Sequence, residues 1–249
     1  MRIATLNLLN GRSLSDGLVD TVRLRSQAAL LGADVLGLQE VDRGQPRSHG
    51  ADQTAEVAAA TGAVDARFVA ALTGTPGLDW APSLVDEPHL PSYGVGLVSR
   101  VPVRRWHVLR LPATPLVVPV PLPGAKRLLW LKDEPRVVLA AELDGLTVAT
   151  THLSFVPGWN VVQLRRVRRW LAGLPGPHVL LGDLNLTPGL ARRATGWSPL
   201  VDAATFPGPA PRLQLDHVLA SRALTVTGAR AHLLTVSDHR ALTVDVALP

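Results

Sequence analysis

The sequence predicts an α/β fold in which two packed, mainly antiparallel β-sheets form the core and helices flank them. Three observations support this prediction. The chain opens with a strand–helix–strand pattern, which is typical of layered α/β folds. Short apolar runs of strand length outnumber helical segments along the chain. Strands of the same kind resume after each long stretch rich in proline and glycine, so we expect one domain over residues 1–249.

The first two elements are a strand and a helix. Arg2–Leu8 is an apolar run and is expected to form a buried strand. A helix should follow, because Ser15 and Asp16 can cap its start, its apolar spacing continues to about Leu31, and Gly32 can end it.

A second strand and a second helix complete the opening pattern. Asp34–Gln39 is a short apolar run, and we expect the strand to end at Glu40. The next helix is expected over residues 53–61, with Asp52 before its first residue and Gly62 after its last.

Most of the remaining elements are strands. Asp144-Gly145 is a strong hairpin signal between two of them. Helices are expected over residues 159–174 and behind Pro188, where Thr187 can act as the cap. Residues 73–92 and 110–135 are rich in proline and glycine and are expected to be long surface loops. The predicted strands are 63–72, 94–99, 103–109, 137–143, 146–151, 178–181, 215–220, 225–232 and 241–247.

Composition excludes several kinds of chemistry. The chain has no cysteine, which rules out disulfides, thiol catalysis and thiolate metal sites. A metal would need carboxylate, amide and imidazole ligands, which suit Mg²⁺ or Mn²⁺. No P-loop motif is present. The net charge of +5 is compatible with nucleic-acid binding, but the arginine bias of a GC-rich genome is the favoured explanation.

We expect a cytoplasmic monomer without a membrane span. The most apolar stretch, residues 116–122, is far shorter than the ~20 residues that a transmembrane helix needs. The N-terminus leads straight into strand-like sequence, with no leader pattern.

Polar side chains gather where apolar runs end. A carboxylate at such a position is costly to bury unless it is paired or binds a metal, although an exposed acid just past a strand is the simpler interpretation for any single one. Asp238 can bind a metal, while His239 can take a proton from water if a carboxylate such as Asp216 fixes its tautomer. The residues concerned are Asn7, Glu40, His152, Asp183, Asn185, Asp216, Asp238 and His239.

The order of these clusters resembles that of the endonuclease/exonuclease/phosphatase superfamily, which has the DNase I-like fold. The resemblance extends over residues 5–240 and is carried by the segments Thr5-Leu6-Asn7, Leu38-Gln39-Glu40-Val41-Asp42, residues 93–100, Thr151-His152-Leu153, Gly182-Asp183-Leu184-Asn185, Leu215-Asp216-His217-Val218 and Ser237-Asp238-His239-Arg240. It implies a four-layer α/β sandwich and a phosphoesterase that depends on Mg²⁺ or Mn²⁺.

The resemblance also implies a role for each residue. Glu40 is expected to be the principal metal ligand, with Asn7 and Asp238 completing the metal site. The scissile phosphate would be contacted by His152 and Asn185. The attacking water would be oriented or activated by Asp183. The general base or acid would be His239 paired with Asp216, and Arg136 stands where relatives often carry an arginine near the site.

The sequence leaves the substrate open between a nuclease and an enzyme acting on a small molecule or lipid head group. His152 stands where the abasic-site repair branch typically has tyrosine, so we rank that activity low. The arginines at 165, 166, 168 and 169 can form a solvated helix face or a nucleic-acid contact. A non-catalytic binding module is a third hypothesis, but no central position of the motif series is lost.

Overall fold

The computed structural model describes residues 1–115, 117–121 and 128–247, and for residues 118–121 and 128–131 it describes the backbone alone. The apolar run 116–122 and the stretch 110–135 therefore lie partly outside the described residues. In the described part of the chain, no helix is long and apolar enough to cross a membrane.

The first sheet has seven strands within the described residues. Its neighbours β1 and β2 run parallel, and every other neighbouring pair is antiparallel. The order is β14 (Thr225–His232), β15 (Ala241–Ala247), β1 (Arg2–Asn7), β2 (Val35–Arg43), β5 (Ser92–Ser99), β3 (Asp65–Gly74) and β4 (Trp80–Pro82).

The second sheet has six strands in the same part of the chain. It also contains one parallel pair, β10 with β11, among antiparallel neighbours. The order is β12 (Ser198–Pro199), β13 (Asp216–Ala220), β11 (His178–Asp183), β10 (Leu146–His152), β9 (Arg136–Leu143) and β6 (Arg105–Leu111).

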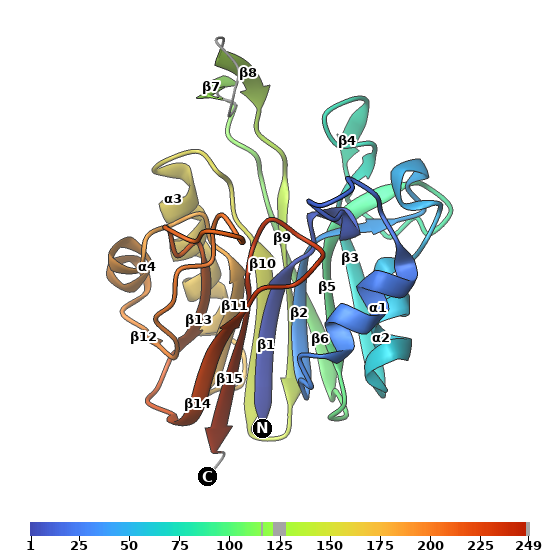
Figure 1. Cartoon of the computed structure of the whole chain (residues 1–249). Helices are drawn as coiled ribbons and strands as arrows, with labels where there is room; N and C mark the ends of the chain where they lie inside the picture. Colours follow the sequence, from blue (N-terminus) through green and yellow to red (C-terminus); the bar gives the residue numbers. More distant parts are fainter. Residues whose placement is uncertain (116, 122–127, 248–249) are drawn as a thin grey trace.

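Two helices cover the outer face of each sheet, so the molecule has four layers (Figure 1). Alternation along the strands explains the arrangement, because successive side chains point to opposite faces. Ile3 packs between the sheets, whereas Ala4 packs under the first pair of helices. The helices are α1 (Thr21–Ala29) and α2 (Gln53–Thr61) on the first sheet, and α3 (Trp159–Leu171) and α4 (Pro188–Thr195) on the second. The predicted four-layer fold is confirmed.

The first helix starts later than predicted. Its cap is Asp20, whose carboxylate accepts hydrogen bonds from the backbone N–H groups of Val22 and Arg23. Asp16 instead forms an ion pair of 2.7 Å with Arg23. The helix therefore begins one turn later than the cap at Asp16 would place it. Thr187 precedes α4 as predicted, but its side chain forms no capping hydrogen bond.

Both stretches that were predicted to be long loops contain strands. The strand β4 lies within residues 73–92 and pairs with β3. The strands β7 (Val117–Pro121) and β8 (Leu128–Lys132) pair with each other and project beyond the end of the two sheets (Figure 1). The prolines on β7 made a strand unexpected from the sequence, because proline is tolerated only on edge strands. Both strands of this two-stranded ribbon are edge strands, so the prolines fit.

The two parallel pairs place polar residues at one edge of the sandwich. Asn7 at the end of β1 lies beside Gln39 of β2, and His152 lies beside Asp183 at the ends of β10 and β11. Asp216 starts β13 directly opposite Asp183. Each sheet therefore delivers side chains to the same edge.

The strand β2 does not end at Glu40 as predicted. Its register with β5 shifts between Leu38 and Val41, so that Gln39 and Glu40 lie opposite a single residue, Val95. Glu40 has a φ of 55°, in the left-handed region. This β-bulge redirects the side chain of Glu40 while the strand continues.

Candidate active site

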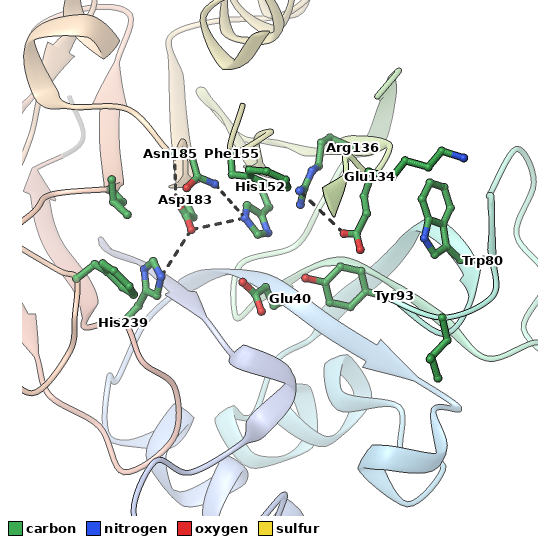
Figure 2. A pocket seen from close by; sticks show the side chains of 15 residues that line it. Glu40, Trp80, Tyr93, Glu134, Arg136, His152, Phe155, Asp183, Asn185 and His239 are labelled. Carbon is green, nitrogen blue, oxygen red and sulfur yellow. Dashed lines mark hydrogen bonds and ion pairs between the residues drawn. The ribbon is translucent and has the colours of Figure 1, made fainter. Parts of the chain in front are cut away.

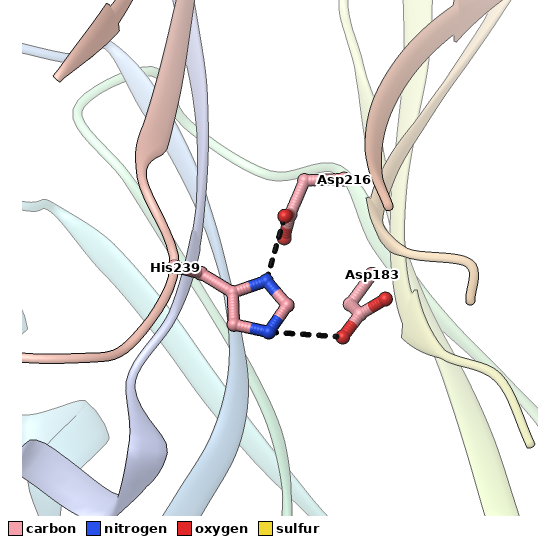
Figure 3. A group of neighbouring side chains, drawn as sticks. All are labelled: Asp183, Asp216 and His239. Atoms are coloured by element: carbon pink, nitrogen blue, oxygen red, sulfur yellow. Dashed lines mark hydrogen bonds and ion pairs between the residues drawn. The ribbon is translucent and has the colours of Figure 1, made fainter. Parts of the chain in front are cut away.

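The imidazole of His239 lies between two carboxylates (Figure 3). Its Nδ1 atom is 2.8 Å from Oδ2 of Asp216, and its Nε2 atom is 3.8 Å from Oδ2 of Asp183. The backbone N–H of His239 donates to Oγ of Ser237, whose φ of 78° forms the tight turn before β15. The aromatic ring of Phe206 packs against the imidazole at a centroid distance of 4.9 Å. The side chain is therefore held in one orientation.

These two carboxylates determine the charge of His239. Burial lowers the pKa of His239, but its hydrogen bond to Asp216 and the charges of Asp216 and Asp183 outweigh burial and raise the pKa to about 10. Burial, together with the charge of Asp216, raises the pKa of Asp183 to about 7. In the metal-free protein at neutral pH, His239 is therefore an imidazolium beside a carboxyl group that is close to its titration midpoint.

Asp183, Asn185 and His152 form a second group of contacts (Figure 2). Oδ1 of Asp183 accepts a hydrogen bond of 2.9 Å from the backbone N–H of Asn185. Nε2 of His152 lies 3.6 Å from Oδ2 of Asp183 and 3.3 Å from Nδ2 of Asn185. Burial, then the positive charge of Arg136, lowers the pKa of His152 well below its usual value. His152 is thus a neutral imidazole that can donate or accept.

Gly182 allows this group to form because it lets two strands approach closely. A Cβ atom on Gly182 would lie 1.9 Å from the backbone oxygen of Thr151 on the adjacent strand, and its φ is 133°. The close approach of these two parallel strands brings Asp183 beside His152.

A third group contains Asn7, Glu40 and Asp238. Nδ2 of Asn7 donates to Oε1 of Glu40 at 3.0 Å and to Oδ2 of Asp183 at 3.2 Å. Burial raises the pKa of Glu40; the Asn7 hydrogen bond opposes this rise, and the charge of Asp238 adds to it. Among the described residues, the buried Oδ1 atom of Asp238 has no hydrogen-bond partner. Two carboxylates that repel each other, one with an unpaired buried oxygen, fit a divalent cation.

The donor set is suited to Mg²⁺ or Mn²⁺, because hard cations take oxygen ligands. Asn7 presents its amide nitrogen to the carboxylates, while its oxygen accepts from the backbone N–H of Leu9. It would ligate a metal through oxygen only with the amide turned around. Asp183, Asp216 and His239 also have ligand atoms within 4.8 Å of one another. Asp216 already occupies Nδ1 of His239 at 2.8 Å, whereas Asp238 has an unpaired buried oxygen, so the Glu40 and Asp238 pair fits a cation better.

The three groups border a cleft of about 660 Å³. Glu40, His152, Asp183, Asn185 and His239 line it, whereas Asn7, Asp216 and Asp238 are not among its described lining residues. The predicted site residues Arg136 and His152 lie in the same cleft, with Nη2 of Arg136 at 4.0 Å from Oε2 of Glu134 (Figure 2). Sequence reasoning gave no site role to the further lining side chains Leu78, Trp80, Tyr93, Lys132, Glu134, Phe155, Phe206 and Leu215.

Tyr93 and Asn160 are two residues that sequence reasoning missed. Burial, then the charge of Glu40, raises the pKa of the Tyr93 hydroxyl well above its usual value, so Tyr93 is a neutral hydrogen-bonding group in the cleft. Nδ2 of Asn160 donates to the backbone oxygen of Asn185 at 2.8 Å and holds the loop after β11. Tyr93 could have been found as the aromatic start of the Tyr93-Gly94-Val95-Gly96 segment, whereas Asn160 carries no sequence signal.

The arginine cluster of α3 lies elsewhere. The side chains of Arg165, Arg166, Arg168 and Arg169 are exposed on the helix, while Leu164 and Val167 pack against the second sheet. None of these arginines lines the cleft. The arrangement favours the interpretation as a solvated helix face.

The two-sheet sandwich and the cleft of carboxylates and imidazoles at its edge define a hydrolase of the phosphoesterase class. The chain belongs to the endonuclease/exonuclease/phosphatase family, whose family model matches residues 4–239. No curated protein sequence matches the chain.

Several solved structures share the fold. An endonuclease/exonuclease/phosphatase from Beutenbergia cavernae is 24% identical with a TM-score of 0.64, and the match covers 100% of this chain and 71% of that one. A protein of the same description from Bacteroides vulgatus is 17% identical with a TM-score of 0.66, covering 100% and 98%. A mannosyl-6-phosphatase from Bacteroides thetaiotaomicron is 13% identical with a TM-score of 0.60, covering 100% of both chains.

Proposed function

We propose that the protein hydrolyses a phosphodiester by attack of water, with a divalent metal as cofactor and His239 as the general base. The observation that carries the proposal is the position of His239, whose Nε2 atom faces Asp183 and the cleft while Nδ1 is held by Asp216 at 2.8 Å. A buried acid that orients a histidine is the usual means of fixing its tautomer for proton transfer.

The metal is assigned to Glu40 and Asp238, with Asn7 as the third group. Mg²⁺ or Mn²⁺ in that place would neutralise phosphate charge and lower the pKa of a bound water. The hydrogen bond and charge of Asp216 and the charge of Asp183 raise the pKa of His239, and the charge of Asp238 adds to this rise, so a metal that neutralises Asp238 would lower the pKa of His239.

The phosphate is assigned to His152, Asn185 and Arg136. His152 is neutral and lies 3.3 Å from the Asn185 amide, so the two can contact adjacent phosphate oxygens. Arg136 adds a positive charge to the same cleft. Groups fixed in this way stabilise developing charge without reorganising during the reaction.

Orientation of the attacking water and transfer of its proton are assigned to Asp183 and His239. Asp183 accepts from the Asn185 N–H and from Asn7, which leaves it directed toward His239. In its ionised form Asp183 can orient the attacking water. Acid–base groups of this kind contribute typically 10²–10⁴-fold each.

The test is hydrolysis of bis-p-nitrophenyl phosphate and of plasmid DNA with Mg²⁺ or Mn²⁺. We expect His239→Ala to lower kcat by roughly 10²–10⁴-fold. The exposed His89 does not line the cleft, and His89→Ala serves as the matched control. Equal rates for wild type and His239→Ala would refute the assignment. A calorimetric titration with Mn²⁺ should show binding in wild type and none in Glu40→Gln, whereas no binding in wild type would support a non-catalytic module.

A second candidate function is hydrolysis of a phosphoester of a small molecule or lipid head group. It is favoured by the cleft wall, where Glu134 and Trp80 stand beside Arg136, and by the α3 arginines, which lie outside the cleft. The fold is shared with the mannosyl-6-phosphatase named above. A rate comparison over plasmid DNA, inositol phosphates, sugar phosphates and nucleotide cofactors separates the two, and DNA as the fastest substrate would contradict this second function.

A further inference from the structure

A second groove opens beside the catalytic cleft and encloses about 630 Å³. Trp80, Lys132 and Arg136 line both spaces and form the border between them. At this border Nζ of Lys132 lies 5.1 Å from the centre of the Trp80 ring. Each volume lies within the range of ~300–1,000 Å³ that is typical of ligand pockets. The two together can therefore hold a substrate that has two parts.

One wall of the groove is fixed to the second sheet and its helix. The backbone oxygen of Pro112 accepts from Nε1 of Trp159 at 3.2 Å and from Nε2 of Gln163 at 3.1 Å. The backbone N–H of Thr114 donates to Oδ2 of the fully buried Asp133 at 2.9 Å. These bonds hold the wall in the shape that the structure shows.

The opposite wall and the floor are fixed to the first sheet. The backbone N–H of Ser83 donates to the oxygen of Ala71, and Oγ of Ser83 donates to the oxygen of Val85 at 2.9 Å. Nη1 of Arg110 on β6 donates to the oxygen of Ala70 on β3 at 2.7 Å. The groove thus lies where the edges of the two sheets meet.

The lining of this groove is mainly apolar, and its charged side chains are all positive. It comprises four prolines, three alanines, two leucines and Trp80, and its charged members are Arg110, Lys132 and Arg136, with no aspartate or glutamate among the described lining residues. Leu84 stands on one wall with 76% of its side chain exposed. The Ser83 hydroxyl donates to the oxygen of Val85, and apart from Thr114 the other polar side chains of the described lining are cationic. The chemistry fits an aliphatic chain attached to an anion.

We propose that this groove binds the alkyl chain of an anionic phosphodiester whose phosphate lies in the catalytic cleft beyond the border residues Lys132 and Arg136. The inference rests on the proposed function and deepens it, because it names the substituent of the phosphate. The adjacency of the two spaces across their shared lining residues and the positive charge at this border carry the assignment.

The experiment measures kcat/KM for p-nitrophenyl phosphodiesters whose second substituent is methyl, butyl or octyl, below the concentration at which micelles form. Burial of one methylene is worth roughly a two- to fourfold gain, so octyl should exceed butyl by at least about tenfold. Leu84→Asp and Ala81→Glu place a charge on the exposed wall. Both variants should reduce the gain in kcat/KM of the octyl over the butyl diester to less than about twofold. The rate with the methyl diester should stay unchanged within about twofold. Leu30→Asp is the control, because Leu30 is 70% exposed on the α1 side and lines neither space.

A binding measurement separates this inference from catalysis. Calorimetry with octylphosphonate and methylphosphonate needs no hydrolysis. Wild type and Leu30→Asp should each bind octylphosphonate at least about tenfold more tightly than methylphosphonate. Leu84→Asp should remove that difference. The inference is overturned by equal affinities in wild type, or by a chain-length gain that persists in both wall variants. Faster hydrolysis of thymidine 5′-p-nitrophenyl phosphate than of the octyl diester, slowed by Leu84→Asp, would also overturn it. If the diesters are not cleaved but octylphosphonate binds as expected, the proposed function fails and the groove assignment stands.

Discussion

Replacing Asp216 with asparagine should lower the pKa of His239 and the stability of the fold together. The rise of the His239 pKa from 6.5 to about 10 corresponds to about 5 kcal/mol in favour of the charged form, and the Asp216 hydrogen bond at 2.8 Å is its main favourable source. Breaking one partner of a buried pair costs roughly 3–5 kcal/mol. We therefore expect Asp216→Asn to destabilise the metal-free protein by about 3–5 kcal/mol at pH 6.

The sign of the pH dependence follows from the raised pKa. A histidine whose pKa is higher in the folded than in the unfolded state contributes its full stability below the unfolded value of 6.5, and loses that contribution as the pH rises through about 10. The difference between wild type and Asp216→Asn should therefore be largest at pH 6 and smallest above pH 10.

Two assays test the reasoning. NMR titration of the His239 imidazole gives its pKa in each variant, and urea unfolding at pH 6, 8 and 10 gives the free energies. Asp245→Asn is the control, because its ion pair with Arg2 is exposed and such pairs are worth at most about 1 kcal/mol. An unchanged His239 pKa in Asp216→Asn, or an unfolding difference that does not vary with pH, refutes the reasoning.

Three further predictions follow from the same geometry. Glu40→Gln should abolish Mn²⁺ binding by calorimetry yet raise the melting temperature of the metal-free protein at pH 8, since it removes repulsion with Asp238; a lower melting temperature would contradict the repulsion. One rising limb of the pH–rate profile should have a midpoint at or below about 7, set by ionisation of Asp183, and should be absent in Asp183→Asn, which keeps the limb set by the base His239; an unchanged profile excludes Asp183. Gly182→Ala should cost more than about 3 kcal/mol in urea unfolding, because its Cβ would meet the Thr151 oxygen at 1.9 Å; a neutral effect would mean that the strands can separate freely.

The helices and hairpins with local signals were predictable. The helix α2 occupies Gln53–Thr61 as predicted, since Asp52 accepts a capping bond from Ala55 and Gly62 adopts the left-handed conformation that ends a helix. The Asp144-Gly145 turn joins β9 to β10. In both cases the residues that decide the structure are adjacent in sequence.

Features decided by distant contacts were not predictable. The bulge at Glu40 depends on pairing with β5, about fifty residues further along the chain, and nothing within the apolar run that precedes Glu40 marks it. The strand β4 is three residues long and exists through pairing with β3. The cap of α1 was expected at Ser15 and Asp16, but Asp16 pairs with Arg23 and Asp20 caps the helix instead.

The proximity of the candidate residues was predictable from the motif order, whereas their detailed geometry was not. The structure brings all the residues named from the motif order to one edge of the sandwich. It also turns the Asn7 amide nitrogen, and not its oxygen, toward Glu40. The aromatic side chains of Phe155 and Phe206 enter the cleft from loops whose course depends on the whole fold.

The parallel strand pairs make the site a reporter of how the sandwich is assembled. Glu40 and His239 come from the first sheet and the loop before its last strand, whereas His152 and Asp183 come from the second sheet. A state that keeps its secondary structure but loses fixed packing between the sheets would retain every strand and lose the cleft. Binding of a phosphate analogue should therefore vanish before the far-ultraviolet dichroism does, which makes ligand affinity a probe of layer docking in this molecule.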